Sequence, residues 1–421
     1  MSMGYITRVN ISGFKAIESG EFDPGGINII TGPNNSGKTS LLESILLCLD
    51  PHSMHRYTNN ISSLVRKGSD TSTIQIKTGS GDREVKLYCP DTDETLSISS
   101  DLIKNRINNK QIIERVGGPY EETEFEELLI SIKEVINRYM NSLADEDIAE
   151  LRDAMLIVEL DGIEYPYINT RRWYHSVIQD HHEELTETVI QELSDDNTLL
   201  QEQETIISEL IEEVFERSFR MHRRGSGYLD KKPDSKSVSF IQDPIIENRR
   251  PPFLRSDDDS VKKVRVRKYL QNREILEDLE DFDFDELVFN REGQEIAIPY
   301  EFMGDGLKTI VGIVWQLAGD DKIADTVLME EPENHLHPGY INELVPFLIQ
   351  FAREEETQLF ITTHNIDFIS EFFSDSILDE NEEYLTNELK LIQMGGLVPK
   401  QFDFTNAQEQ IEDIHNDLRG I

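Results

Sequence analysis

Cysteine is scarce in this chain: Cys48 and Cys89 are the only two among 421 residues. Two cysteines give neither a disulfide framework nor the ligand spacing of a zinc site, so a fold stabilised by several disulfides and one stabilised by zinc are both excluded. Apolar runs of 18 or more residues are also absent, and residues 1–8 lack the apolar core of a signal peptide. The sequence therefore predicts no membrane span and a cytoplasmic location.

Basic residues are also few, with 41 Lys and Arg against 82 Asp and Glu, which gives a formal net charge of −41. Such a surface repels itself in dilute salt, whereas at molar salt the screening length falls to about 3 Å and the penalty largely disappears. A salt-adapted host and an ordinary acidic protein both fit this composition. The charge argues against duplex DNA wrapping broadly over the surface, but it permits a local basic site.

One stretch carries a specific pattern: Gly32-Pro33-Asn34-Asn35-Ser36-Gly37-Lys38-Thr39 matches G-x-x-x-x-G-K-[ST], the phosphate-binding P-loop. The apolar residues 26–30 before it predict a buried strand, and residues 39–47 after it predict a helix with apolar i, i+3 and i+4 spacing. A strand, a glycine loop and a helix start aim backbone N–H groups at one point, which favours a bound anion. The sequence therefore predicts binding of a nucleoside triphosphate.

Within this stretch the residue types suit separate tasks. Lys38 is expected to reach the β- and γ-phosphates, and the Thr39 hydroxyl to bind Mg²⁺. Gly32 and Gly37 permit backbone angles and close approaches that a Cβ forbids. We expect all of residues 32–40, Ser40 included, to contact the nucleotide.

Carboxylates and a histidine follow two further predicted strands. Residues 325–329 form a short apolar run that ends at Glu330 and Glu331, and we assign Glu330 to Mg²⁺ and Glu331 to the attacking water as general base. A second apolar run, 357–362, precedes His364, which we expect to contact the γ-phosphate. His335 and His337 are interpreted as loop or interface residues, because Mg²⁺ prefers oxygen ligands.

The middle of the chain differs in composition. Residues 101–220 are helical in pattern and acidic, with apolar stripes at helix spacing within 125–143 and 206–215. In residues 217–273 the charge reverses, since 16 Lys and Arg lie there. This segment is either a phosphate-contacting patch for DNA, RNA or the nucleotide, or a basic face that pairs with the protein's own acidic surface.

Taken in order, these segments resemble the ABC-type ATPases of the SMC/RecF group, and in particular the ATPase module of the OLD family. The matching segments are 11–17, 32–40, 303–308, 330–338 and 362–364. The resemblance implies an α/β P-loop NTPase with an ABC ATPase head domain, a mixed sheet, a β-rich N-terminal lobe and a helical insertion. It also implies ATP and Mg²⁺ as cofactors and a homodimer, or a higher homo-oligomer, that closes around ATP.

Further roles follow from the resemblance alone. Met303 to Leu307, with Gly304 and Gly306, would be the signature segment that contacts the partner's γ-phosphate. Residues 334–338 would lie at the dimer seam, and His364 would be the switch histidine. The chain departs from the pattern in three places: the signature lacks its usual serine, Glu330 replaces an aspartate, and no Q-loop glutamine is evident.

The family's nucleases carry a C-terminal Toprim domain, and the 57 residues after His364 (421 − 364) are too few for one. Nuclease chemistry would then come from a partner subunit, as in two-component anti-phage ATPases. We expect four segments: an N-terminal P-loop lobe (1–100), a helical insertion (101–250), a C-terminal ATPase lobe (251–400) and a tail (401–421).

Two functions fit the sequence. The first is an ATPase that dimerises around ATP and drives DNA or a partner effector, in DNA repair or anti-phage defence. The second is a nucleotide-sensing scaffold that sequesters or releases a partner protein, with slow hydrolysis as a timer.

Overall fold

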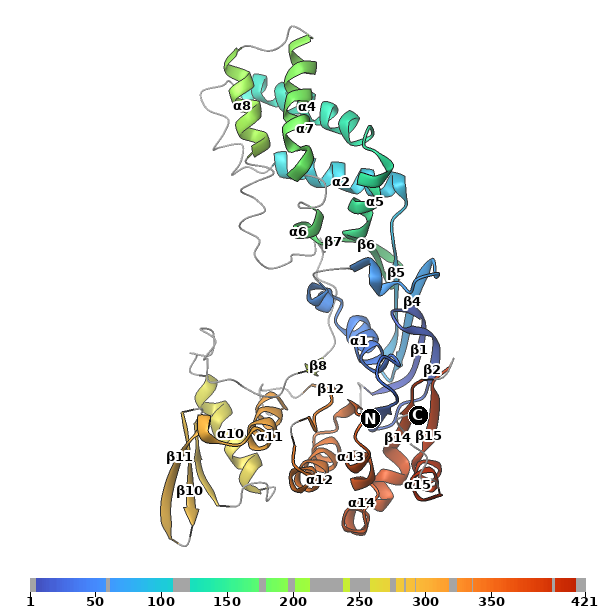
Figure 1. Ribbon diagram of the computed structural model, residues 1–421, viewed down its shortest axis with the longest axis vertical. Helices are drawn as coiled ribbons and strands as arrows, with labels where there is room; N and C mark the ends of the chain where they lie inside the picture. Colours follow the sequence, from blue (N-terminus) through green and yellow to red (C-terminus); the bar gives the residue numbers. More distant parts are fainter. Residues whose placement is uncertain are drawn as a thin grey trace. The chain divides into compact units, whose positions relative to one another are not determined.

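The chain forms two compact units in a computed structural model (Figure 1). The first unit is Met1–Pro51, Thr73–Glu84 and Asp234–Ile421, and the second is His52–Ser72 and Val85–Pro233. The structure describes 5–57, 61–108, 122–173, 179–195, 201–212, 238–242, 258–272, 278–283, 285–291, 293–317, 324–334, 336–395 and 398–413.

The first unit is built on a six-stranded mixed sheet with the order β15-β14-β3-β13-β12-β8. Its strands are β3 (Ile27–Thr31), β8 (Val238–Ile241), β12 (Thr326–Glu330), β13 (Gln358–Thr362), β14 (Leu389–Gln393) and β15 (Lys400–Asp403). All neighbours pair in parallel except β14 and β15, which are antiparallel. The carboxyl ends of β3, β13, β12 and β8 therefore meet at one edge of the sheet.

Burial explains the composition of these central strands. Every residue of β3 and β13 is buried, as expected for parallel strands covered on both faces. The expected strands at 26–30, 325–329 and 357–362 are confirmed, each displaced by about one residue.

The first unit also contains helices, some of which contact the strands of this sheet. They are α1 (Lys38–Leu49), α10 (Asp258–Asn272), α11 (Asp305–Leu317), α12 (Pro338–Glu354), α13 (Ile366–Glu371), α14 (Asp375–Glu388) and α15 (Phe404–Asp413). α12 begins with a proline at its first position, where the missing N–H costs nothing. The Asn365 side chain caps α13 by accepting from the amides of Asp367 and Phe368. The main core of the unit lies between these helices and the sheet.

Two smaller groups of strands complete the first unit. β1 (Ile6–Phe14) pairs antiparallel with both β2 (Ile17–Phe22) and β4 (Thr71–Thr78). β9 (Leu279–Phe282), β10 (Glu286–Arg291) and β11 (Gln294–Pro299) form an antiparallel sheet of their own. α10 packs on β9 and on α11, and Figure 1 shows these elements together.

The second unit combines helices with a hairpin. Its helices are α2 (Thr92–Ile107), α4 (Glu122–Met140), α5 (Asp145–Asp153), α6 (Thr170–Trp173), α7 (Gln179–Asp195) and α8 (Gln201–Glu212), with 3-10 turns at Pro51–Arg56 and Ile61–Leu64. The predicted apolar stripes on α4 and α8 are buried in one core with Trp173 at 0% exposure. The described part of each stripe is thus a packing face; residues 214 and 215 lie outside the described residues.

A β-hairpin lies within the stretch expected to be helical. β6 (Met155–Leu160) and β7 (Ile163–Ile168) are antiparallel and joined by Asp161-Gly162, whose φ angles are 50° and 83°. Two residues with positive φ fit the tight turn that Asp-Gly favours between strands. The insertion expected to be helical therefore also contains strands, because the apolar run Met155–Leu160 belongs to a strand.

The same hairpin bears on the expected segment boundaries. The end of β5 (Gly81–Tyr88) pairs with β6, from Val85 opposite Leu160 to Tyr88 opposite Ile157. This pairing places residues 85–100 in the second unit, whereas the sequence grouped them with the P-loop lobe.

Candidate nucleotide site

The P-loop connects β3 to α1 as the sequence predicts. Gly32 has φ 145° and Gly37 has φ 98°, angles that side-chain-bearing residues rarely adopt. A Cβ on Gly32 would lie 2.3 Å from the carbonyl oxygen of Met394, closer than any real contact. Both glycines are therefore required by the backbone itself, independently of any ligand.

The loop leaves polar groups ready for an anion. Within the described part of the chain, no side chain caps the start of α1, whose first-turn N–H groups have no intrahelical partner. The Ser36 hydroxyl is buried without a hydrogen-bond partner among the described residues. Asn34 and Asn35 lie exposed at the loop tip, and Ser40 is buried in α1. An uncapped helix start beside an unsatisfied hydroxyl fits a phosphate group.

Lys38 lies across this loop and is 7% exposed. Its Nζ donates to the carbonyl oxygens of Gly32 at 2.9 Å and Pro33 at 3.0 Å. Burial lowers the pKa of Lys38, and nearby carboxylates, Glu331 foremost, act to raise it. The Lys38 ammonium is thus hydrogen-bonded to neutral carbonyl oxygens of the loop. A bound triphosphate would replace these acceptors with charged phosphate oxygens.

The carboxylate strand meets the P-loop directly. The Thr39 hydroxyl donates to Glu330 Oε1, although 291 positions separate the two residues in the sequence. A threonine hydroxyl and a carboxylate are hard oxygen donors, and this pair fits Mg²⁺ with the remaining positions left to phosphate and water. The structure therefore brings the two predicted metal ligands together at one edge of the sheet.

Gln242 joins the same group and was missed in the sequence. It directly follows β8, and its Nε2 donates to Glu330 Oε2 at 3.1 Å. The signal available was a glutamine after the short apolar run Val238–Ile241. That signal is weak until β8 is known to lie beside β12.

The Glu331 backbone lies in the left-handed region, with φ 46°. Two donors contact its carboxylate. His364 Nδ1 lies 3.0 Å from Glu331 Oε1, and Asn334 Nδ2 donates to Glu331 Oε2 at 3.0 Å. The Glu331 amide donates to the Thr362 carbonyl at 2.9 Å, which ties the turn to β13. A non-glycine residue with positive φ is strained, and such strain gathers at functional sites.

The comparisons with known proteins agree with this geometry. Residues 27–370 match the family described as "AAA domain, putative AbiEii toxin, Type IV TA system". The chain belongs to this family. It is a P-loop ATPase of the SMC/RecF type, as the sequence indicated.

Named relatives of this AAA domain differ in how much they share with it. An "ATP/GTP phosphatase" from Helicobacter pylori is 23% identical over 422 residues, covering 98% of this chain and 99% of that protein. The "DNA replication and repair protein RecF" of Shewanella pealeana is 32% identical over 83 residues, 20% of this chain and 22% of that protein. The "DNA double-strand break repair Rad50 ATPase" of Methanopyrus kandleri is 28% identical over 126 residues, 27% and 14% respectively.

The chain thus spans less than a quarter of the RecF and Rad50 relatives. An SMC head domain from Thermotoga maritima overlaps 94% of this chain and 98% of that one, with 10% identity and a TM-score of 0.42. An overlap this loose supports no inference about function.

The segment expected to be the signature, Met303 to Leu307, lies at the start of α11. Gly304 is exposed with open space around its Cα, whereas Gly306 is buried and a Cβ there would lie 2.8 Å from the Tyr340 ring. Among the residues that the structure describes, no hydrogen bond joins Gly304 or Gly306 to the P-loop. Gly306 therefore has a packing reason for being glycine, and its predicted role toward a second protomer stays a prediction.

The predicted histidine and basic segments have structural partners where they are described. His337 Nδ1 accepts from the Gly339 amide at 3.2 Å and caps α12; His335 lies outside the described residues. Most of the 217–273 segment also lies outside them. On α10, Lys263 pairs with Asp283 and Arg267 with Asp281, as a basic face that contacts the protein's own acids would do.

Other candidate sites are less developed. Nowhere in the described ranges do three His, Cys, Asp or Glu side chains gather to hold a metal ion. No helix described here has the length and apolar content to cross a bilayer.

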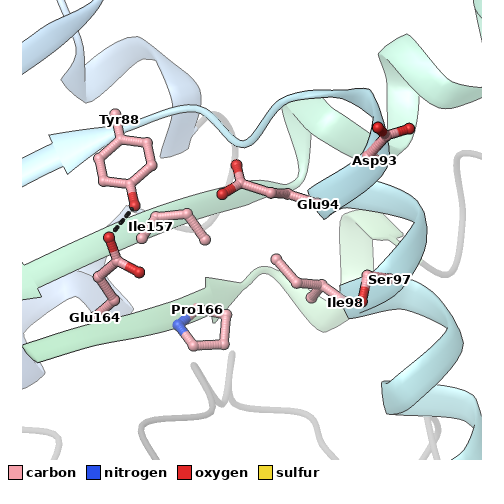
Figure 2. Close-up of a pocket in the computed structure, with 8 residues that line it drawn as sticks. All are labelled: Tyr88, Asp93, Glu94, Ser97, Ile98, Ile157, Glu164 and Pro166. Carbon is pink, nitrogen blue, oxygen red and sulfur yellow. Dashed lines mark hydrogen bonds between the residues drawn. The ribbon is translucent and has the colours of Figure 1, made fainter.

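A cavity of about 490 Å³ in the second unit lies between α2 and the strands β5 to β7 (Figure 2). It is lined by Tyr88, Asp93, Glu94, Ser97, Ile98, Ile157, Glu164 and Pro166, and contains no residue of the nucleotide site.

Proposed function

We propose that this AAA domain binds ATP with Mg²⁺ and hydrolyses its terminal phosphoanhydride. The observation that carries the proposal is the hydrogen bond from Thr39 to Glu330, which joins the P-loop to the carboxylate edge. Mg²⁺ bound there would neutralise charge on the phosphates. Lys38 and the α1 amides would bind and orient the triphosphate.

Glu331 would act as general base in this reaction. Glu331 directly follows Glu330 in the sequence, and the charges of both carboxylates act on Lys38. His364 and Asn334 each contact one oxygen of Glu331. A water placed between Glu331 and the γ-phosphate would lose its proton to this carboxylate as it attacks. His364, whose side chain is 46% exposed, would contact the γ-phosphate.

The complete site would require a second copy of the chain. Gly304 lies exposed just before α11, whose first-turn amides would meet the partner's γ-phosphate. Residues 334–338 would lie at the seam between the protomers. A homodimer that closes around ATP would couple hydrolysis to DNA or to an effector subunit, in DNA repair or anti-phage defence.

Two substitutions test the ATPase. Lys38→Ala should abolish ATP binding measured by calorimetry, because it removes the ammonium that meets the phosphates. Lys400→Ala, an exposed lysine of β15, serves as the matched control and should bind ATP normally. Equal ATP affinity in both variants would remove Lys38 from the site.

Glu331→Gln should retain ATP and accumulate a dimer detectable by light scattering. Unchanged turnover in this variant would rule out Glu331 as the base. Turnover should rise when DNA is added if DNA is the coupled partner. Slow turnover that DNA leaves unchanged, with a partner protein released on ATP binding, would indicate the nucleotide-sensing scaffold instead.

A further inference from the structure

The Glu331 and His364 side chains meet from two separate loops. Glu331 follows β12 and His364 follows β13, and their contact is 3.0 Å long. The His364 side chain is 46% exposed, so surrounding packing does not fix it. The backbones of the two loops must therefore hold these side chains within contact distance of each other.

A buried hydrogen bond lies beneath this contact. Glu333 is 3% exposed and Thr363 is 0% exposed. The Thr363 hydroxyl donates to Glu333 Oε1, and the same oxygen of Thr363 accepts from the Asn365 amide at 3.0 Å. Because His364 lies between Thr363 and Asn365, one hydroxyl group ties the backbone on both sides of the histidine to Glu333.

Rigid elements anchor the ends of this connection. The Thr363 amide donates to the Ile30 carbonyl of β3 at 2.9 Å. Asn365 Oδ1 accepts from the Asp367 and Phe368 amides at 2.9 and 3.3 Å and so caps α13. The histidine therefore sits on a short loop whose neighbours are bound to a strand, a helix and the loop that carries Glu331.

A carboxyl group is a poor choice here for stability alone. Glu333 Oε2 is buried and has no hydrogen-bond partner among the described residues. Burying an unsatisfied oxygen lowers stability, and an aliphatic or shorter side chain avoids that loss. What Glu333 supplies is an acceptor oxygen, Oε1, that fixes the direction of the Thr363 hydroxyl.

We propose that Glu333 and Thr363 are positioning residues, which hold the His364 loop so that its imidazole reaches the Glu331 carboxylate. The proposal rests on the ATPase function proposed above. It assigns neither residue to the substrate, and both act through His364.

Thr363→Val tests the proposal, because valine keeps the shape and removes the hydroxyl. We expect kcat to fall about 10- to 100-fold, as small misplacements near a reacting centre do. KM for ATP should stay within about twofold, since Lys38 and the P-loop are untouched. Thr363→Ser should restore kcat. A loss confined to KM, or no loss at all, would overturn the proposal.

The control is Thr357→Val. Thr357 is also buried, at the opposite end of β13, and its hydroxyl donates to the Ala324 carbonyl at 3.1 Å. This variant loses a comparable buried hydrogen bond without contacting the His364 loop, so kcat should not change. An equal fall in kcat for both variants would show a general loss of packing instead.

A second background separates positioning from support of the fold. In a His364→Ala protein, adding Thr363→Val should cause no further loss of kcat, because the residue through which Thr363 acts is gone. A loss by the same factor in both backgrounds would contradict the proposal.

Amide hydrogen exchange tests the positioning without relying on turnover. Exchange at His364 and Asn365 should rise about tenfold in Thr363→Val and stay unchanged in Thr357→Val. A wild-type protein that binds ATP without turnover would refute the proposed ATPase, and this exchange result would still decide the positioning. Equal amide exchange at His364 and Asn365 in wild type and Thr363→Val would overturn the positioning role.

Discussion

Glu333 should make the stability of this protein depend on pH near neutrality. Desolvation by burial raises the pKa of Glu333 from 4.5 to about 7, against the smaller opposing effect of the Thr363 hydrogen bond. The side chain is 3% exposed, so solvent screens it little. In the folded protein this carboxyl therefore keeps its proton over a pH range in which the unfolded chain has lost it.

The sign follows from proton binding. Between pH 4.5 and about 7 the folded state holds more protons at Glu333 than the unfolded state, so stability falls as pH rises. The stabilisation is complete below pH 4.5 and is lost as the pH passes the folded value of about 7. The folded and unfolded pKa values differ by about 2.5, and each pKa unit corresponds to about 1.4 kcal/mol. The free energy of unfolding therefore falls by an amount on the order of 3 kcal/mol.

Glu333→Gln removes this titration while keeping the size of the side chain. Urea unfolding of wild type and variant at about pH 5 and about pH 8.5 should show the variant gaining on wild type by up to about 3 kcal/mol at the higher pH. Glu380→Gln, an exposed carboxyl on α14, should show no such gain. If the stability difference between wild type and Glu333→Gln is the same at both pH values, the burial argument is wrong.

Three further predictions concern the loop, the base and the charge. Gly32→Ala should abolish ATP binding and lower stability by about 1–3 kcal/mol, because its Cβ would lie 2.3 Å from a carbonyl oxygen. Gly68→Ala, with φ 92° and nothing within 4 Å, is the control and should carry only the backbone strain; equal ATP affinity in the two variants would refute the steric argument. Asn334→Ala should lower kcat about tenfold with ATP affinity unchanged, because Glu331 loses one of its two donors; unchanged kcat in steady-state assays would contradict this. With a net charge of −41, the melting temperature should rise from dilute to molar KCl, and a flat profile would argue against a salt-adapted surface.

Local patterns were sufficient for part of the fold. The P-loop is contiguous in the sequence, so strand, glycines and helix start could be predicted together and are observed as β3, the loop and α1. The stripe on α4 is a repeat over neighbouring turns, and it is buried as expected. The Asp161-Gly162 turn was equally local, yet the acidic, helical surroundings hid it, although Asp-Gly between apolar runs is a strong hairpin signal.

Contacts between distant segments depended on the order of the strands. Gln242 lies 88 positions from Glu330 and joins it because β8 pairs with β12. Likewise, Thr363 and Glu333 lie 30 positions apart, and both are buried because β13 and β12 are neighbours. A sequence pattern does not specify which strands are neighbours in the sheet.

The sequence by itself therefore determined that a triphosphate loop exists and which carboxylates and histidine accompany it. Only the tertiary structure decided that Thr39 meets Glu330, that Gln242 stands beside them, and that Glu333 is buried beneath His364. The reason is physical: backbone angles and periodicity are set by neighbouring residues, whereas burial and side-chain partners are set by packing between elements far apart in the chain.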